Sequence, residues 1–482
     1  MASNRVLRVR RTPHSVTDGE LDEGITRIQE ELGVSPDFPA EVEQAASEAA
    51  ASPRLPDLDL TDVPFVTIDP ESAMDLDQAL HIERADKGYT VRYAIADVAA
   101  FVAPDSPVDV EANRRGETLY GADAKVPLHP KVLSEDAASL LPDRVRPAIV
   151  WTMTVDPSGE GTDVKVERAL VRSRAKLSYE QVQADLGAGN ADEVFQLLEE
   201  VGRLRQEREA SRGGVSLPLP EQELVEERGE WRLEFRSLLP VEDWNAQISL
   251  LTGMAAASLM VEARVGILRT LPPVDPRDVQ RLRRTAKALG VPWPADQDHA
   301  AFIRSLDVTQ ASHAAVVVAA TRLLRGSGYV AFDGEVPDQS EHSALASQYA
   351  HVTAPLRRLV DRYALEVCVA LSAGREVPDW VTARFDDIAD TMRESGRKAN
   401  QYENAIVDLS EAEVLKSRVG STFPGVIVEA DEKNPARGVV TIQDPAVEAR
   451  VSAERDLPVG EDVSVELVEA DPVTRSVAFR LA

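Results

Sequence analysis

The sequence predicts a large α+β protein that ends in a small β-barrel. Strand-like and helix-like segments mix between residues 64 and 415. Five short strand-like segments then follow one another within the last ~60 residues. The chain has 482 residues, and 43% of them are hydrophobic. This length exceeds one average domain and allows a sizeable core, so we expect more than one domain.

The first 61 residues read as an N-terminal helical region followed by a linker. Residues 1–12 form a short arm with four arginines, and an acidic helix is expected from residue 15 to about residue 32. Residues 33–62 are rich in Pro, Ala, Ser and Glu, which is typical of a linker with one short helix. We expect no barrel in this region.

Residues 62–415 read as the main domain, a mixed sheet surrounded by helices. Strands are expected at 65–69, 79–83, 89–94, 149–155 and 163–171, with Asp86-Lys87-Gly88 as a hairpin turn. Expected helices cover 194–212, 246–263, 276–289, 309–325, 355–372 and 380–415. The five strands of residues 416–482 fit a small barrel of the oligonucleotide/oligosaccharide-binding type.

The composition indicates the cellular compartment and excludes some classes of site. One cysteine, Cys368, excludes a disulfide framework and a cysteine-based zinc site. The N-terminus has no apolar signal segment, and apolar runs such as 314–320 are far too short to span a bilayer. We therefore expect a soluble, cytoplasmic protein with no membrane partner. The net charge of −29 means that the average surface is acidic, which disfavours a nucleic-acid partner. The same net charge still allows a basic groove within an acidic shell.

Three aspartates lie close together after a strand-like run, in the stretch TIDPESAMDLDQAL (67–80). Asp69, Asp75 and Asp77 would repel one another unless a proton or a cation neutralises them. Hard oxygen ligands of this kind suit Mg²⁺ or Mn²⁺. A solvated acidic turn is the plain alternative. An EF-hand loop fails, because its glycine and glutamate positions hold Leu80 and Asp86.

A second constellation lies in YAHVTAPLRRLVDRY (349–363). Arg357 and Arg358 follow Pro355, which is expected to open a helix. Two arginines at a helix N-terminus add to its positive end, and an anion docked there would explain them. An ordinary surface pair is the alternative. Together with a metal site, the pair suits phosphodiester cleavage.

These blocks resemble the ribonuclease II/R family of RNB-domain exoribonucleases. TIDPESAMDLDQAL is similar to the family signature, commonly TIDPxxAxDxDDA. Further similar blocks follow in family order, among them YAIADVAAFV, PLHPKVLSEDAASL, LPVEDWNAQISLL and YAHVTAPLRRLVDRY. The resemblance covers about residues 62–415, and 420–482 resembles the family's C-terminal S1-type barrel.

The resemblance implies a Mg²⁺-dependent, processive 3′→5′ exoribonuclease, with Mn²⁺ as a possible substitute. It would thread single-stranded RNA through a channel and release nucleoside 5′-monophosphates. By motif position, Asp77 and Arg357 are catalytic, and the metal ligands are Asp69, Asp75, Asp77 and Gln78. The RNA contacts carried over are Tyr120 as a base-stacking ring, Tyr179, Glu242, Arg358 and Glu403. For Tyr120, Tyr179, Glu242 and Glu403, ordinary packing or a solvated helix face is the alternative.

The sequence departs from the family pattern in three places. Gln78 stands where the family usually has a fourth aspartate, so Gln78→Asp is expected to lower the Mg²⁺ concentration needed for half-maximal activity. About 60 residues precede the main domain, too few for the family's two cold-shock barrels. Leu217 stands at a stacking position where some members have phenylalanine.

Two further expectations concern function. Gln78 leaves open a catalytically impaired RNA-binding protein, and a DNA-directed nuclease is a third possibility. Over residues 420–482, Asp and Glu outnumber Lys and Arg by 12 to 6, and Phe423 and Phe479 are the only aromatics. Such a barrel would grip single strands weakly, so we expect low affinity, a shallow salt dependence and low processivity. We expect a monomer.

Overall fold

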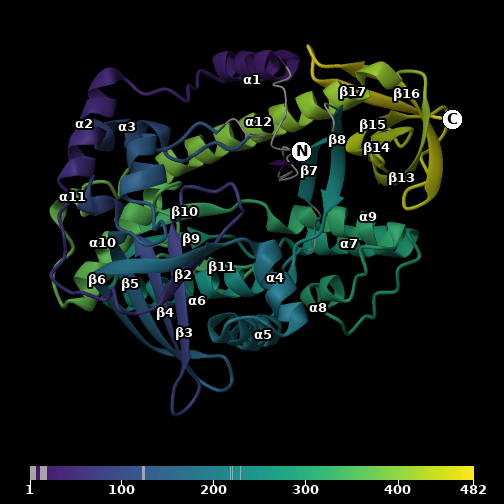
Figure 1. Cartoon of the computed structure of the whole chain (residues 1–482). Helices are drawn as coiled ribbons and strands as arrows, with labels where there is room; N and C mark the ends of the chain where they lie inside the picture. Colours follow the sequence, from purple (N-terminus) through teal and green to yellow (C-terminus); the bar gives the residue numbers. More distant parts are fainter. Residues whose placement is uncertain are drawn as a thin grey trace.

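Two closed five-stranded barrels, joined by a long helix, organise the protein (Figure 1). The computed structural model describes residues 7–10, 19–121, 125–217, 219, 221–227, 230–431 and 433–482. Helix α12 (Ile388–Leu415) runs between the two barrels. The predicted α+β class and the C-terminal barrel are confirmed.

The first barrel contains the mixed sheet that the sequence predicts. Its strands are β2 (Phe65–Ile68), β3 (Gln78–Arg84), β4 (Tyr89–Ala96), β5 (Val145–Val155) and β6 (Gly161–Leu177). Strand β2 pairs antiparallel with β3 and parallel with β6, and these two pairings close the sheet. The β3–β4 hairpin pairs Gln78 with Ile95 at one end and Arg84 with Tyr89 at the other.

Side chains on both faces of this barrel pack into hydrophobic core clusters. On β4, Val91, Tyr93 and Ile95 belong to one core cluster, whereas Ala94 and Ala96 belong to another. Helices α5 (Glu193–Arg212), α6 (Pro240–Ala263) and α10 (Leu359–Ser372) contribute to the first cluster. Helices α2 (Ala40–Ala51) and α3 (Pro107–Arg115) contribute to the second.

Helix α6 is the one helix of the described chain with the length and apolarity of a membrane span. Several of its apolar side chains pack into the core of the protein. Ile248, Leu251 and Met260 are all buried in the cluster around the first barrel. Burial in this core accounts for the composition of the helix.

The segment after α6 forms a small helical layer beside the barrel. Strands β9 (Val265–Thr270) and β10 (Gly328–Asp333) pair antiparallel. The connection between them contains α7 (Pro276–Ala288), α8 (His299–Arg304) and α9 (Ala311–Ala320). Two short strands, β11 (Glu341–His342) and β12 (Ser347–Gln348), follow. Trp293 stacks on Phe302 with ring centroids 3.9 Å apart and holds α7 and α8 together.

The N-terminal region packs against α12 and the C-terminal barrel. In α1 (Gly19–Leu32), Leu21, Ile25 and Ile28 recur at helical spacing and are buried in a core shared with α12 and that barrel. Part of the basic arm forms β1 (Leu7–Arg10), which pairs parallel with β7 (Glu221–Glu227), and β7 pairs with β8 (Glu230–Arg236). The sequence did not indicate this three-stranded sheet.

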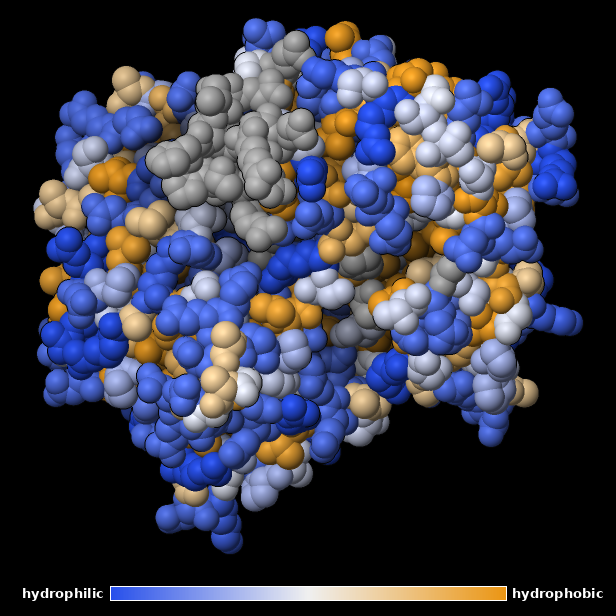
Figure 2. All heavy atoms as spheres, turned by 45° about the vertical axis from the view of Figure 1, so that its right-hand side comes forward, coloured by the Kyte–Doolittle hydropathy of each residue, from blue (hydrophilic) through white to orange (hydrophobic). Residues whose placement is uncertain are grey.

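The C-terminal barrel has the strand order β13-β14-β15-β17-β16. Its strands are β13 (Thr422–Ala430), β14 (Arg437–Gln443), β15 (Ala446–Ser452), β16 (Asp462–Asp471) and β17 (Ser476–Leu481). Phe423 and Phe479 meet edge to face in its interior, with ring centroids 5.9 Å apart. On the face shown in Figure 2, hydrophilic side chains dominate and hydrophobic ones are scattered in small groups.

Candidate active site

The aspartate stretch forms a turn between β2 and β3 that two polar side chains hold in place. The hydroxyl of Ser139 donates to the Met74 carbonyl at 2.6 Å and accepts from the Leu76 N–H at 2.9 Å. The ammonium of Lys176 donates to the Glu71 carbonyl at 2.7 Å. Ser139, after the helical turn Leu133–Ala137, and Lys176 on β6 therefore fix the backbone of the turn.

Asp77 occupies the most buried position of the three aspartates, with 5% of its surface exposed. Its Oδ1 accepts the backbone N–H of Leu356 at 2.8 Å, and its Oδ2 lies 3.5 Å from Nε of Arg357. Burial raises the pKa of Asp77 well above its usual range, although Arg357 and the Leu356 N–H oppose this. The turn and the arginine segment thus meet at one carboxylate.

Asp69 follows β2 directly, and the charges of Arg357 and Asp75 act on it as they do on Asp77. Burial raises its pKa to about 7; Arg357 lowers it and Asp75 raises it further. The pKa of Asp77 is raised by Asp75 as well. Asp75 therefore lies close enough to influence both other carboxylates.

Asp75 is paired with a lysine that the sequence did not single out. The Nζ of Lys125 lies 3.1 Å from Oδ1 of Asp75 and 2.8 Å from Oε1 of Glu135. Lys125 is only 23% exposed. A lone lysine in a mostly apolar stretch soon after Tyr120 was the available signal, but nothing in the sequence specified its partner.

Gln78 uses both polar atoms of its amide in hydrogen bonds within the protein. Its Nε2 donates to the Thr353 carbonyl at 2.6 Å, and its Oε1 accepts the hydroxyl of Tyr93 at 2.6 Å. These bonds link the turn to β4 and to the arginine segment. The metal-ligand role of Gln78 stays a prediction, and the hydrogen bonds give the residue a structural role beside it.

The two arginines precede their helix, which corrects the expected helix start at residue 355. Helix α10 begins at Leu359, because the N–H groups of Arg357 and Arg358 both point to the Ala354 carbonyl in a tight turn. Arg358 forms two bonds with the buried Asp361, at 2.8 and 2.9 Å. Arg357 has no such clamp, and its side chain is 44% exposed. Of the pair, Arg357 has the more exposed side chain, since that of Arg358 is 20% exposed.

Two tyrosines border this group. Tyr120 is 38% exposed, and burial of its hydroxyl end raises its pKa; Arg357, Asp75 and Asp77 also act on it. The hydroxyl of Tyr179 accepts from Asn245 at 3.2 Å. Burial and Asp69 raise its pKa to about 12. The structure therefore gathers Asp69, Asp75, Asp77, Arg357, Tyr120 and Tyr179 around one place.

The two glutamates predicted to contact RNA, Glu242 and Glu403, lie on different helices. Glu242 caps α6, since its carboxylate accepts the Leu239 N–H at 2.8 Å and binds Arg236 at 2.6 Å. It contributes to the raised pKa of Tyr179, so it adjoins the group. Glu403 lies on α12, where burial and then Glu117 raise its pKa to about 7. The sequence did not point to this carboxylate pair.

The donor atoms of the turn are of the type that Mg²⁺ and Mn²⁺ prefer, since all three aspartates offer carboxylate oxygens. Within the described residues, no group of three His, Cys, Asp or Glu side chains is close enough to hold an ion as it stands. Asp75 instead contacts the ammonium of Lys125. The residues thus fit a divalent cation in donor chemistry, and Lys125 supplies part of the positive charge.

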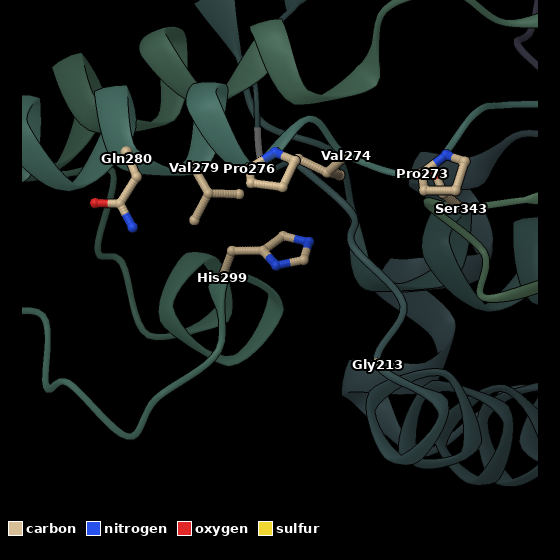
Figure 3. A pocket seen from close by; sticks show the side chains of 8 residues that line it. All are labelled: Gly213, Pro273, Val274, Pro276, Val279, Gln280, His299 and Ser343. Atoms are coloured by element: carbon tan, nitrogen blue, oxygen red, sulfur yellow. The ribbon is translucent and has the colours of Figure 1, made fainter.

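Two cavities of the structure lie away from the aspartate turn. One of about 380 Å³ lies between α7 and α8, where the imidazole of His299 faces Val279 and Pro276 (Figure 3). Another of about 410 Å³ is lined by Arg283, Lys287 and Trp293, among others. Neither is lined by a residue of the aspartate turn.

Comparison with known proteins agrees with this arrangement. The RNB domain model matches residues 58–371, and the model of the RNase II-type exonuclease C-terminal S1 domain matches residues 421–482. The chain is 28% identical to Ribonuclease R of Escherichia coli over 402 residues, which is 77% of this chain and 48% of that protein. It is 30% identical to Ribonuclease R of Vibrio parahaemolyticus over 77% of this chain and 47% of that protein.

Solved structures show the same fold. Mycoplasma genitalium RNase R in complex with ribose-methylated single-stranded RNA matches with a TM-score of 0.84 and 19% identity, over 99% of this chain and 85% of that one. Yeast Ssd1, a pseudonuclease, matches with a TM-score of 0.72 and 16% identity, over 89% and 55% of the two chains. The chain spans about half the length of the curated relatives it matches. Since the RNB model covers well over half of the sequence, the chain belongs to the RNB family, with an RNase II-type S1 domain at its C-terminal end.

Proposed function

We propose that this chain is a Mg²⁺-dependent exoribonuclease that hydrolyses single-stranded RNA from its 3′ end and releases nucleoside 5′-monophosphates. The observation that carries the proposal is the contact between Asp77 and Arg357, 3.5 Å from Nε to Oδ2, within a group of three carboxylates. A carboxylate turn beside an exposed guanidinium suits hydrolysis of a phosphodiester. Membership of the RNB family supports it.

Each residue of the group has a role in this proposal. Asp69, Asp75 and Asp77 would hold the divalent ion, with Mn²⁺ as a substitute, and the ion would polarise the phosphate and activate water. Arg357, with its open side chain, binds phosphoryl oxygens and stabilises their charge. The Leu356 N–H keeps the carboxylate of Asp77 in one orientation.

The surrounding residues would contact the RNA strand. The exposed part of the Tyr120 ring offers a stacking face for a terminal base. Tyr179 and Glu242 would line the strand beside Asp69, and Glu403 would do so from α12. Arg358 contributes by holding its loop through Asp361. We further propose that the protein is a cytoplasmic monomer; its single cysteine allows no disulfide framework, which supports a reducing compartment.

The test is the degradation of a labelled single-stranded RNA. With Mg²⁺ we expect stepwise shortening from the 3′ end and release of mononucleotides; EDTA abolishes both. Asp77→Asn lowers the rate by at least about 10²-fold, whereas Asp86→Asn, the same change in the exposed hairpin turn, leaves it unchanged. A matched DNA strand tests the DNA-directed alternative, because 2′-hydroxyl contacts distinguish the two nucleic acids.

A second candidate function is RNA binding without cleavage. The observation favouring it is the neutral, hydrogen-bonded amide of Gln78 where relatives usually have a carboxylate. In this case the chain retains labelled RNA in a filter or anisotropy assay, while no mononucleotide appears with Mg²⁺ or Mn²⁺. That outcome refutes the exoribonuclease proposal.

A further inference from the structure

The lysine bridge at Asp75 joins three separate segments of the chain. Lys125 directly precedes Val126, which pairs with Leu119, and Glu135 lies in the helical turn Leu133–Ala137. Asp75 belongs to the aspartate turn. The side chains of Lys125, Asp75 and Glu135 are 23%, 15% and 21% exposed, so water screens their contacts only partly. The bridge is therefore part of the architecture of the site.

The bridge also changes the charge that a metal ion would meet. Besides the exposed Glu71, the turn carries the three aspartates of the site, and the next residue, Gln78, is neutral. The ammonium of Lys125 lies 3.1 Å from an oxygen of Asp75. A cation this close lowers the affinity of a carboxylate for any other cation, whether a proton or a metal ion, because the two positive charges repel each other.

We propose that Lys125 is a positioning residue of the proposed nuclease site, a built-in cation that holds Asp75 and competes with divalent ions on that side of the turn. The inference rests on the proposed function, because it assigns Asp75 to the ion. Glu135 contacts the same ammonium at 2.8 Å, so the positive charge of Lys125 is shared between Asp75 and Glu135. The cluster then binds a divalent ion more weakly than three uncompensated aspartates would.

The test measures Mn²⁺ binding to the full chain in the absence of RNA, by calorimetric titration and by the electron paramagnetic resonance signal of free Mn²⁺. We expect Lys125→Met to tighten Mn²⁺ binding about tenfold, the size of one pKa unit of charge compensation. Lys125→Arg retains the charge and keeps the native affinity. Lys131→Met is the matched control at an exposed lysine, and it leaves the binding isotherm unchanged.

Unchanged or weaker Mn²⁺ binding by Lys125→Met would overturn the proposal, as would tightening by the control. Absence of Mn²⁺ binding in the native chain and all variants would also overturn it. If Lys125→Met does not fold, the native chain and Lys125→Arg are compared with Glu135→Gln. That change removes a negative charge and strengthens the hold of Lys125 on Asp75, so Mn²⁺ binding weakens; an unchanged isotherm contradicts the role. RNA is absent throughout, so failure here is distinct from failure to cleave RNA.

Discussion

The backbone N–H of Leu356 donates to Oδ1 of Asp77 at 2.8 Å, across 279 positions of the sequence. This one bond brings the aspartate turn against the segment that carries Arg357. Gln78 adds a second connection between the same two segments through the Thr353 carbonyl. The site is thus a junction of two segments, and changes on either side are expected to act on both.

Arg357→Lys keeps the charge and removes the planar fork of donors. We expect the RNA-cleavage rate to fall by about 10²-fold or more, because a lysine reaches phosphoryl oxygens as a point charge only. Steady-state kinetics with a single-stranded RNA measure the effect, which lies mainly in kcat. The control is Arg375→Lys, on an exposed turn. A rate equal to that of the native chain would remove Arg357 from the reaction.

Gln78→Glu preserves the length of the side chain and removes its donor. An ionised carboxylate would then face the Thr353 carbonyl, so we expect the free energy of unfolding to fall by about 1–3 kcal/mol. Protonation restores a donor, and the loss shrinks at acidic pH. Denaturant unfolding at two pH values measures this.

Gln181→Glu on the exposed face of α4 (Tyr179–Ala188) is the control for Gln78→Glu, with little expected change. Stability equal to the native chain at neutral pH would show that the bond to Thr353 contributes nothing. Gln78→Asp also removes this donor. Its effect on the Mg²⁺ requirement therefore needs a parallel measurement of stability.

Glu403 makes the stability of the protein depend on pH. Its pKa rises from 4.5 to about 7 on folding, so between these values the folded state binds more protons than the unfolded state. Stability is therefore higher below about pH 4.5 and falls as the pH rises to about 7. Glu403→Gln removes this fall and stabilises the protein at neutral pH by at most about 3 kcal/mol. Melting temperatures of the native chain and of Glu403→Gln, measured across this pH range, test the prediction. Parallel curves for the two proteins would contradict the raised pKa of Glu403.

We expect the C-terminal barrel to anchor RNA only weakly. Phe423 and Phe479, its two aromatic residues, are 2% and 1% exposed, so neither offers a stacking face. Acidic residues outnumber basic ones there by 12 to 6. We expect log K against log salt to have a slope shallower than about −5, measured by anisotropy with the Asp77→Asn chain so that the RNA stays intact. A steeper slope would mean many phosphate contacts.

The local features of this protein could be predicted from its amino-acid sequence alone. Alternating strands and turns predicted the five-stranded C-terminal barrel and the β3–β4 hairpin. The pattern of motifs indicated the family and the aspartate turn. Helix starts were less accurate, as for α10, because Pro355 begins a turn that ends before the helix.

Which of these features come into contact depends on how the whole chain folds. Closure of the first barrel, the pairing of Lys125 with Asp75 and the bonds of Gln78 all join residues far apart in the chain. Periodicity reports which face of a segment is buried, but a long-range partner depends on how whole elements pack. For that reason the carboxylates could be named from the sequence, whereas the cation beside Asp75 could not.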